Sequence, residues 1–176
     1  DFAARLLDLR RHAVWGAGLR AEAKGSVRSG TPGMGGRALV RYAITQEDVK
    51  KARRATRVMC DLFLAAGALE VYPGVAGVAS VVRTAREAAL VEEQGPLDAR
   101  AYAMSMTHLF STARMGSDPQ TRVVGLDFQH DEVGGLYVAD SSVFPSNTGV
   151  NPQVPIMALA QLCAQAVGGM RARAAA

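Results

Sequence analysis

The sequence predicts an α+β fold in which an antiparallel sheet is flanked by helices, and three observations support this prediction. Short apolar runs separated by glycines fill residues 13–43, as is typical of antiparallel strands. Apolar residues then recur every three or four positions over residues 46–66, which indicates an amphipathic helix. Residues 154–167 are apolar almost all round, and a helix without a polar face is expected in a protein interior.

The first third of the chain is expected to hold one short helix and the strands of the sheet. Residues 1–12 carry apolar side chains at helical spacing, which predicts a helix. The glycine-rich loop Gly30–Gly36 is expected at one end of the sheet. The strands are predicted at Val14–Arg20, Ser26–Arg28 and Ala38–Ala43.

The predicted helix over residues 46–66 has recognisable signals at both ends. Thr45 and Asp48 have the spacing of a capping box, with aspartate in place of glutamate. Gly67 stands where a residue in the left-handed conformation would end the helix. Both ends of this element are therefore fixed by local chemistry as well as by the apolar pattern.

Short strands and helices are expected to alternate in the rest of the chain. Residues 80–103 have a helical pattern that Gly95 and Pro96 interrupt. Three further strands are predicted, at Leu69–Tyr72, Met106–Ser111 and Leu136–Ala139. The apolar helix over residues 154–167 then follows.

The composition is that of a soluble globular protein, with 49% hydrophobic and 20% charged residues. No apolar run is long enough to span a bilayer, so no membrane span is expected. No secretory signal opens the chain, which favours the cytoplasm. The first residue is Asp1 rather than Met, as in a processed chain, an excised piece or an incomplete gene model, so the location stays open. Cys60 and Cys163 fall within apolar helical patterns, which favours buried free thiols over a disulfide or a metal pair.

The formal charge of +4 raises nucleic-acid binding as a possible function. Lysines and arginines gather on the predicted helix over residues 46–66, but no aromatic residues alternate with them as a stacking surface would require. A solvated helix face is the favoured interpretation. We therefore expect no nucleic-acid partner.

The start of the last helix has a chemistry of its own. Asparagine is a preferred N-cap and proline a preferred first helical residue, and the chain has Asn151 followed by Pro152. Such a helix directs its free N–H groups and the positive end of its dipole at whatever lies before it. The residues alone leave two interpretations open: a site that stabilises negative charge, or a well-capped structural helix.

Two segments of the last third resemble the C-terminal signature of the glucose–methanol–choline oxidoreductases. The runs that carry the resemblance are GLYVADSSVFP (135–145), GVNPQ (149–153) and IMALA (156–160). Upstream, HLFSTARMG (108–116) resembles the family's His-x-x-Gly-Thr-x-x-Met-Gly segment. The order and spacing of these blocks match over residues 105–167, whereas residues 13–75 resemble the family's substrate domain less specifically.

The resemblance implies an oxidoreductase that passes hydride from a small-molecule alcohol to FAD and so forms a carbonyl. His108 matches the active-site histidine and is expected to be the general base, since an imidazole titrates near neutral pH. Asn151 matches the second active-site position, from which it would donate a hydrogen bond to the substrate oxygen.

The resemblance also implies where the flavin would lie. The start of the last helix would face the N1–C2 carbonyl region of the ring, where negative charge accumulates on reduction. Contacts near the ribityl–pyrophosphate portion fall on Asp140 and Ser141. Contacts beside the ring fall on Val150, Asn151, Pro152 and Gln153.

By the same resemblance, residues 1–120 are expected to form a substrate-binding domain. Residues 121–176 would return to complete an FAD-binding domain with a C-terminal strand and the buried helix. The family's Gly-x-Gly-x-x-Gly turn, which binds the ADP part of FAD, has no counterpart, because Gly30–Gly36 lacks that spacing. The N-terminal dinucleotide-binding half would then be supplied in cis or in trans. The alternative is a non-catalytic fragment or interaction subunit that needs a separate flavin-binding chain.

One residue departs from the family pattern inside residues 108–116, which we call the histidine segment. Ser111 stands where the family usually has glycine. The backbone is expected to be less permissive there, or the loop to differ slightly, because only glycine adopts positive φ without steric strain.

Overall fold

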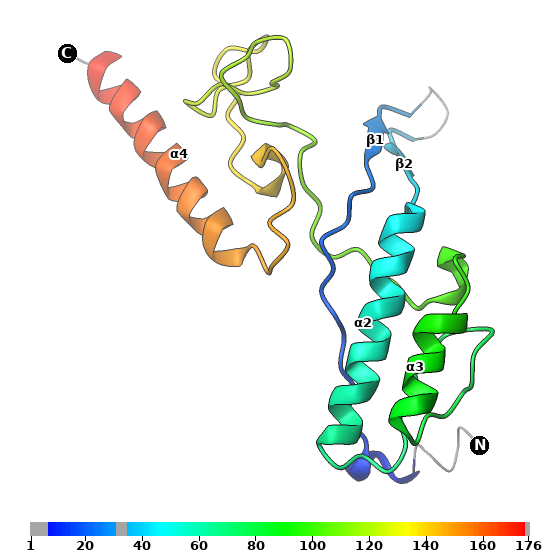
Figure 1. Ribbon diagram of the computed structural model, residues 1–176. Coiled ribbons are helices and arrows are strands. Elements are labelled where there is room, and N and C mark those ends of the chain that lie inside the picture. Colours follow the sequence, from blue (N-terminus) through cyan, green and yellow to red (C-terminus); the bar gives the residue numbers. More distant parts are fainter. Residues whose placement is uncertain (1–6, 31–34, 175–176) are drawn as a thin grey trace. The chain divides into compact units, whose positions relative to one another are not determined.

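The computed structural model describes residues 7–30 and 35–174. The described residues form three α-helices, short 3-10 turns and one small antiparallel sheet, so the predicted α+β class is confirmed (Figure 1). The chain divides into two compact units. The first unit comprises Asp1–Gly18 and Val49–Ala103, and the second unit comprises Leu19–Asp48 and Met104–Ala176.

Helix α2 (Gln46–Ala65) has the ends that the sequence predicts. The Thr45 hydroxyl accepts a hydrogen bond from the Asp48 amide at 3.1 Å, and the Asp48 carboxylate accepts one from the Thr45 amide at 3.4 Å. At the other end Gly67 adopts a φ of +92°, and its amide donates to the carbonyl of Leu64 at 3.0 Å. The predicted helix over residues 46–66 is therefore confirmed, because local signals at both ends fix its length.

The core of the first unit lies between α2 and α3 (Ala85–Gln94). Val71 and Val82 form an isolated antiparallel bridge beside the two helices, which is all that the predicted strand Leu69–Tyr72 becomes. The buried residues of this core are Cys60, Val71, Val82, Ala88 and Val91. Cys60 and Cys163 are both buried free thiols, as predicted.

The predicted interruption of residues 80–103 is confirmed. Helix α3 begins after Thr84, whose hydroxyl accepts a hydrogen bond from the Glu87 amide at 3.2 Å. It ends at Gly95, and the chain then makes the 3-10 turn η2 (Ala99–Ala101). Of the helix predicted over residues 1–12, residues 1–6 lie outside the described part, and the 3-10 turn η1 (Leu9–Arg11) lies within it.

The sheet of the second unit consists of β1 (Gly25–Arg28) and β2 (Leu39–Tyr42). The strands are antiparallel, with Gly25 opposite Tyr42 and Arg28 opposite Leu39. The two strands predicted at Ser26–Arg28 and Ala38–Ala43 are thus confirmed. Almost every residue of both strands is exposed, so this sheet has no covered face within the described residues.

Three other predicted strands are wrong for this chain. Val14–Arg20 and Met106–Ser111 run without regular secondary structure, and Leu136–Ala139 contains only the single bridge between Tyr137 and Gln129. A strand is stabilised by hydrogen bonds to a neighbouring strand, and an apolar pattern does not reveal whether that neighbour is present. Within the described residues, no neighbouring strand pairs with these three segments.

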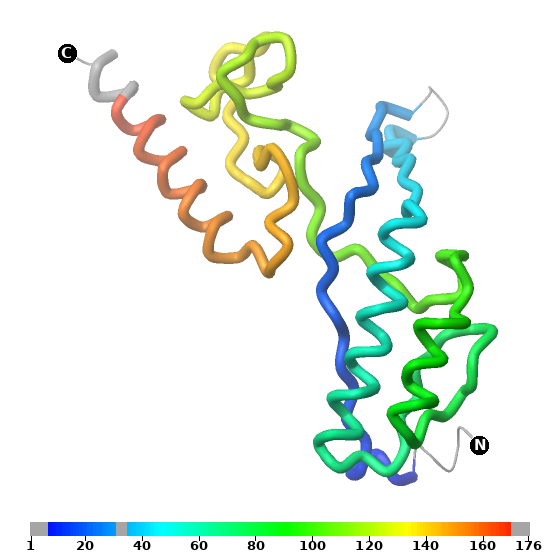
Figure 2. The backbone as a smooth tube through the Cα atoms, viewed as in Figure 1, coloured from blue at the N-terminus to red at the C-terminus, as the bar shows by residue number. Residues whose placement is uncertain are grey.

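Residues 113–143 of the second unit form a loop whose two ends lie side by side, and we call this segment the excursion (Figure 2). Its ends are joined by hydrogen bonds from the Ala113 amide to the Ser142 carbonyl at 3.1 Å and from the Met115 amide to the Val143 carbonyl at 2.9 Å. The excursion buries its own apolar residues, including Val124, and ends in the 3-10 turn η3 (Ser141–Val143).

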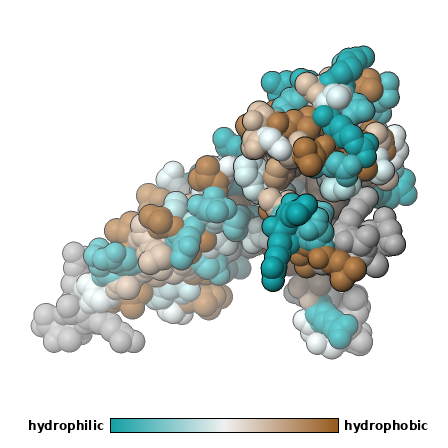
Figure 3. All heavy atoms as spheres, turned by 90° about the horizontal axis from the view of Figure 1, so that it is seen from below, coloured by the Kyte–Doolittle hydropathy of each residue, from teal (hydrophilic) through white to brown (hydrophobic). Residues whose placement is uncertain are grey.

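Helix α4 (Gln153–Ala174) includes and extends the predicted range, but the prediction that it is buried is wrong for this chain. Val154, Met157 and Leu162 are 75%, 63% and 52% exposed. Among the α4 side chains that the structure describes, up to residue 169, only Cys163 is buried. A helix that is apolar all round needs cover on every face, and the described residues do not supply it. Apolar residues reach the surface in the space-filling view as well (Figure 3).

Two further sequence expectations concern the whole chain. No helix in the described ranges is both long enough and apolar enough to cross a bilayer. The division into a domain of residues 1–120 and a returning segment of residues 121–176 refers to a larger enzyme and stays a prediction.

Candidate active site

An open pocket of about 390 Å³ lies at the first turn of α4 in the second unit. His108 lines it from the irregular segment that precedes the excursion, and Asn151 lines it from the residues that lead into the helix. The two candidate catalytic side chains therefore border one pocket. The lining residues are His108, Asn151, Pro152, Gln153, Ile156 and Met157.

The first turn of α4 presents few but well-defined hydrogen-bond donors. The earliest intrahelical hydrogen bond there runs from the Ile156 amide to the Pro152 carbonyl at 2.9 Å. Pro152 and Pro155 have no N–H, so the amides of Gln153 and Val154 are the donors that the helix itself leaves without an acceptor. Of these two residues, Gln153 lines the pocket, and its amide together with the helix dipole makes this end of the pocket favourable for negative charge.

The approach to Asn151 is fixed by contacts with residues 20–21 of the same unit. The Asn147 side-chain amide donates to the Ala21 carbonyl at 2.7 Å. Gly149 has a φ of +70°, and a Cβ atom there would lie 3.2 Å from the Arg20 side chain. The backbone conformation therefore favours glycine at this position, and a Cβ atom there would also displace the Arg20 side chain slightly.

The next residues of that segment are held by the carboxylate of Asp48, which is 4% exposed. It accepts hydrogen bonds from the amides of Glu22 at 2.7 Å and Ala23 at 3.0 Å, and from the Thr45 hydroxyl at 2.9 Å. Burial alone would raise the pKa of Asp48, but these hydrogen bonds outweigh burial and hold the pKa below its ordinary value. An ionised Asp48 therefore joins the start of α2 to the segment that supports the approach to Asn151.

The histidine segment is attached to the chain beyond η3. The Ser111 hydroxyl donates to the Phe144 carbonyl at 2.8 Å, and the rings of Phe110 and Phe144 meet edge to face with centroids 5.6 Å apart. Ser111 has a φ of +70°, so this serine adopts the conformation that glycine adopts most easily.

Asp140 and Ser141 lie at η3 and do not line the pocket. The Asp140 carboxylate accepts a hydrogen bond from the Ser142 amide at 2.8 Å, which caps this 3-10 turn. Asp140 is exposed, whereas Ser141 is half-buried. Val150, the remaining predicted flavin contact, is 70% exposed and directly precedes Asn151.

The groups in and around the pocket at α4 fit the ring end of a flavin. Amide donors at the start of α4 suit the negative charge that a reduced ring carries, and exposed apolar side chains such as Val150 and Met157 suit its hydrocarbon part. The ADP end is different, because in the described ranges no Gly-x-Gly-x-x-Gly turn joins a strand to a helix. Within the described ranges, the residues therefore suit only one end of the cofactor.

Sequence reasoning missed two residues of the pocket, Ile156 and Met157. Helical geometry could have found them, because residues three and four positions after Gln153 lie on the same face of a helix. They give the pocket an apolar wall beside its polar groups.

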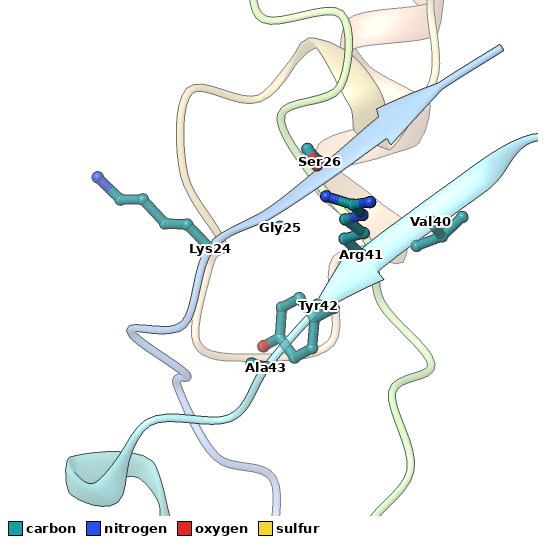
Figure 4. Close-up of a pocket in the computed structure, with 7 residues that line it drawn as sticks. All are labelled: Lys24, Gly25, Ser26, Val40, Arg41, Tyr42 and Ala43. Atoms are coloured by element: carbon teal, nitrogen blue, oxygen red, sulfur yellow. The ribbon is translucent and has the colours of Figure 1, made fainter.

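A second open hollow, of about 460 Å³, lies on the β1–β2 hairpin (Figure 4). It is larger than the pocket at α4, but none of the candidate catalytic or flavin-binding residues line it. Its wall is formed by the exposed sheet, from Lys24 to Ser26 and from Val40 to Ala43. We assign the candidate site to the pocket at α4, because His108 and Asn151, the two candidate catalytic residues, both line it.

Comparison with known proteins places the chain among the oxidoreductases. A family model described as GMC oxidoreductase matches residues 21–160, which is most of the chain. This range includes His108, Asn151 and the first turn of α4. The chain belongs to the GMC oxidoreductase family.

Individual relatives support the same assignment. The chain is 33% identical over 148 residues to an uncharacterized GMC-type oxidoreductase of Mycobacterium tuberculosis, covering 84% of this chain and 22% of that protein. It is 30% identical over 166 residues to a long-chain-alcohol oxidase of Arabidopsis thaliana, covering 91% and 22%. A choline oxidase of Arthrobacter globiformis is 37% identical over 73 residues, covering 37% and 12%. The chain thus spans about a fifth of the length of the first two relatives.

Proposed function

We propose that the protein to which this chain belongs oxidises the CH–OH group of an alcohol to a carbonyl with FAD, and that this chain supplies His108 and Asn151 to the site. The observation that carries the proposal is the pocket at α4, which both side chains line together with the first turn of the helix. The family and the relatives named for alcohol and choline oxidation support it.

In this proposal each group meets one demand of the reaction. His108 takes the hydroxyl proton of the alcohol, and Asn151 donates a hydrogen bond to the same oxygen. The Gln153 amide and the positive end of the helix dipole stabilise negative charge at their end of the pocket. FAD, when bound, accepts the hydride.

The proposal requires a flavin-binding half that the described residues do not contain. Residues 1–120 would serve as the substrate-binding part, and residues 121–176 would complete the flavin site with Asp140, Ser141 and residues 150–153. The exposed apolar surface of α4 supports this requirement, since a surface of this kind marks a place where another protein segment packs.

A second candidate function rests on the same exposed helix. The chain would be a non-catalytic interaction subunit that docks through α4 on a separate flavin-binding chain. The chain would then keep its fold, but its pocket would have no part in turnover. The two functions differ in what they require of His108.

The test compares single variants of the flavin-loaded enzyme that contains this chain, with a long-chain alcohol and choline as probes. His108→Ala should slow flavin reduction by about 100-fold or more while flavin stays bound, because the general base is lost. Asn151→Ala should slow it less, by about 10-fold, because one hydrogen bond is lost. Reduction is followed by the loss of flavin absorbance in stopped flow.

The matched control is His12→Ala. His12 is an exposed histidine of the first unit whose Nδ1 lies 2.8 Å from the Asp8 carbonyl, and its loss should leave the rate unchanged. Unchanged reduction in His108→Ala would remove that residue from the mechanism and favour the interaction subunit. Normal kinetics in Asn151→Ala would reduce its role to the helix cap.

A further inference from the structure

We propose that Ser111 is a positioning residue, whose hydrogen bond to the Phe144 carbonyl holds a left-handed turn that keeps His108 beside Asn151. The inference rests on the proposed function, because it assigns a residue that orients the general base of that reaction. It follows from backbone conformation, side-chain contacts and the path of the chain.

Residue 111 has a strained backbone conformation. Ser111 has a φ of +70°, and among the described non-glycine residues only Phe128, with a φ of 69°, shares this region. An L-residue with a side chain is strained there, because Cβ approaches the backbone carbonyl too closely. Such a conformation persists only where surrounding contacts hold it.

Contacts with Phe144 hold this conformation in place. The Ser111 hydroxyl donates to the Phe144 carbonyl at 2.8 Å. The preceding residue, Phe110, places its ring edge to face against the Phe144 ring, at an interplanar angle of 81°. Ser111 therefore contacts the backbone of Phe144, and Phe110 contacts its side chain.

The contacts with Phe144 tie the segment that carries His108 to the chain before Asn151. Residues 103–111 have no regular secondary structure, so helix or strand hydrogen bonds do not fix the position of His108. The tie at Ser111 stands a few residues after His108, and Phe144 stands a few residues before Asn151. It therefore joins the two parts of the chain that bring the polar side chains to the pocket at α4.

The test uses Ser111→Ala and Ser111→Gly in the flavin-loaded enzyme. Alanine loses the hydrogen bond and keeps the strain, so hydrogen exchange of the nearby Ala113 and Met115 amides, which donate to the Ser142 and Val143 carbonyls, should be about fivefold faster. The kcat should fall about fivefold with KM unchanged, since a displaced base affects the chemical step and not alcohol binding. Glycine adopts the turn without strain and should restore both quantities to within about twofold of wild type.

Ser117→Ala is the matched control, since it makes the same change at an exposed serine of the excursion and should alter neither quantity. Wild-type exchange and kcat in Ser111→Ala would overturn the proposal, and so would a Ser111→Gly variant no better than Ser111→Ala. Exchange is measured without substrate, so it tests the turn even if no alcohol reduces the flavin. In that event the proposed function fails, while the exchange data still decide the structural role of Ser111.

Discussion

The buried carboxylate of Asp48 supports the backbone next to the segment that leads to Asn151. Its oxygens accept hydrogen bonds from the amides of Glu22 and Ala23 and from Thr45 at the start of α2. The same segment receives the Asn147 side chain at Ala21. A single ionised group thus helps to set the course of the backbone that leads to Asn151.

We predict that Asp48→Asn lowers the free energy of unfolding by about 2 kcal/mol at neutral pH, because a charged acceptor is replaced by an amide that cannot serve all of these donors. The pKa of Asp48 is lowered by folding, so its contribution is complete above the unfolded value of 3.8 and is lost as the pH falls through the folded value. The difference between the two proteins should therefore be constant near neutrality and shrink below about pH 4. Urea unfolding across this pH range measures it.

Asp98→Asn provides the control for burial. Hydrogen bonds from Arg100 lower the pKa of Asp98 to about 2, but this carboxylate is exposed to solvent. Its replacement should change stability less than the replacement of Asp48, because solvent compensates an exposed group. An equal loss in both variants would show that the burial of Asp48 has no special effect.

The end of helix α3 depends on Gly95, where the surrounding atoms leave no room for a side chain. A Cβ atom at Gly95 would lie 2.4 Å from the Val91 carbonyl oxygen and 2.9 Å from the Tyr102 hydroxyl. The Gly95 carbonyl also accepts a hydrogen bond from Arg53 of α2 at 2.8 Å. The chain therefore passes between α3, α2 and Tyr102 with no room for a side chain.

Gly95→Ala should lower the free energy of unfolding by about 2 kcal/mol, since overpacking forces a backbone shift. Thermal or urea unfolding checks this. Gly134→Ala is the control, because no atom lies within 4 Å of the Cβ position at Gly134. A Gly95→Ala variant as stable as the control would show that the backbone relaxes without loss.

Sequence predicted the elements whose signals are local. Helix α2 was predicted to within one residue because its apolar spacing, its capping box and Gly67 all lie within it or next to it. The extended segment Val14–Arg20 was mistaken for a strand because strand formation depends on a partner elsewhere in the chain. The burial of α4 was predicted wrongly for the same reason, since burial depends on what covers a helix.

The candidate site was predictable in part. His108 and Asn151 were found through a family resemblance, and their roles stay a prediction. Ile156 and Met157 follow from helical spacing once the helix start is known. The left-handed serine at position 111 was visible only as a departure from the family pattern, because its hydrogen bond to Phe144 joins positions far apart in the sequence.

For the whole molecule, we predict that this chain alone does not retain FAD, because its described residues suit the flavin ring but not the ADP portion. Together with the N-terminal half of the enzyme it should retain FAD after gel filtration. Flavin absorbance in the protein peak measures both cases. Leu162→Glu, at an exposed apolar position of α4, should weaken this retention, whereas Gln161→Glu, at the exposed polar position beside it, should not.

Full retention of flavin by the isolated chain would contradict the prediction that the N-terminal half must supply the part of the site that binds the ADP portion. Full retention with Leu162→Glu and the N-terminal half together would instead show that α4 has no part in the assembly. The two results are independent, because the first concerns the cofactor and the second concerns the helix surface.

The excursion over residues 113–143 has a consequence for how such proteins change over time. Its two ends are tied directly to each other, from Ala113 to Ser142 and from Met115 to Val143. Residues added or removed near its glycine pair at 134–135 would alter the outline of the loop while its base keeps the same width. Evolution can therefore lengthen, shorten or decorate this loop while His108 and Asn151 keep their separation, which makes it a natural place for lineage-specific insertions or an engineered tag.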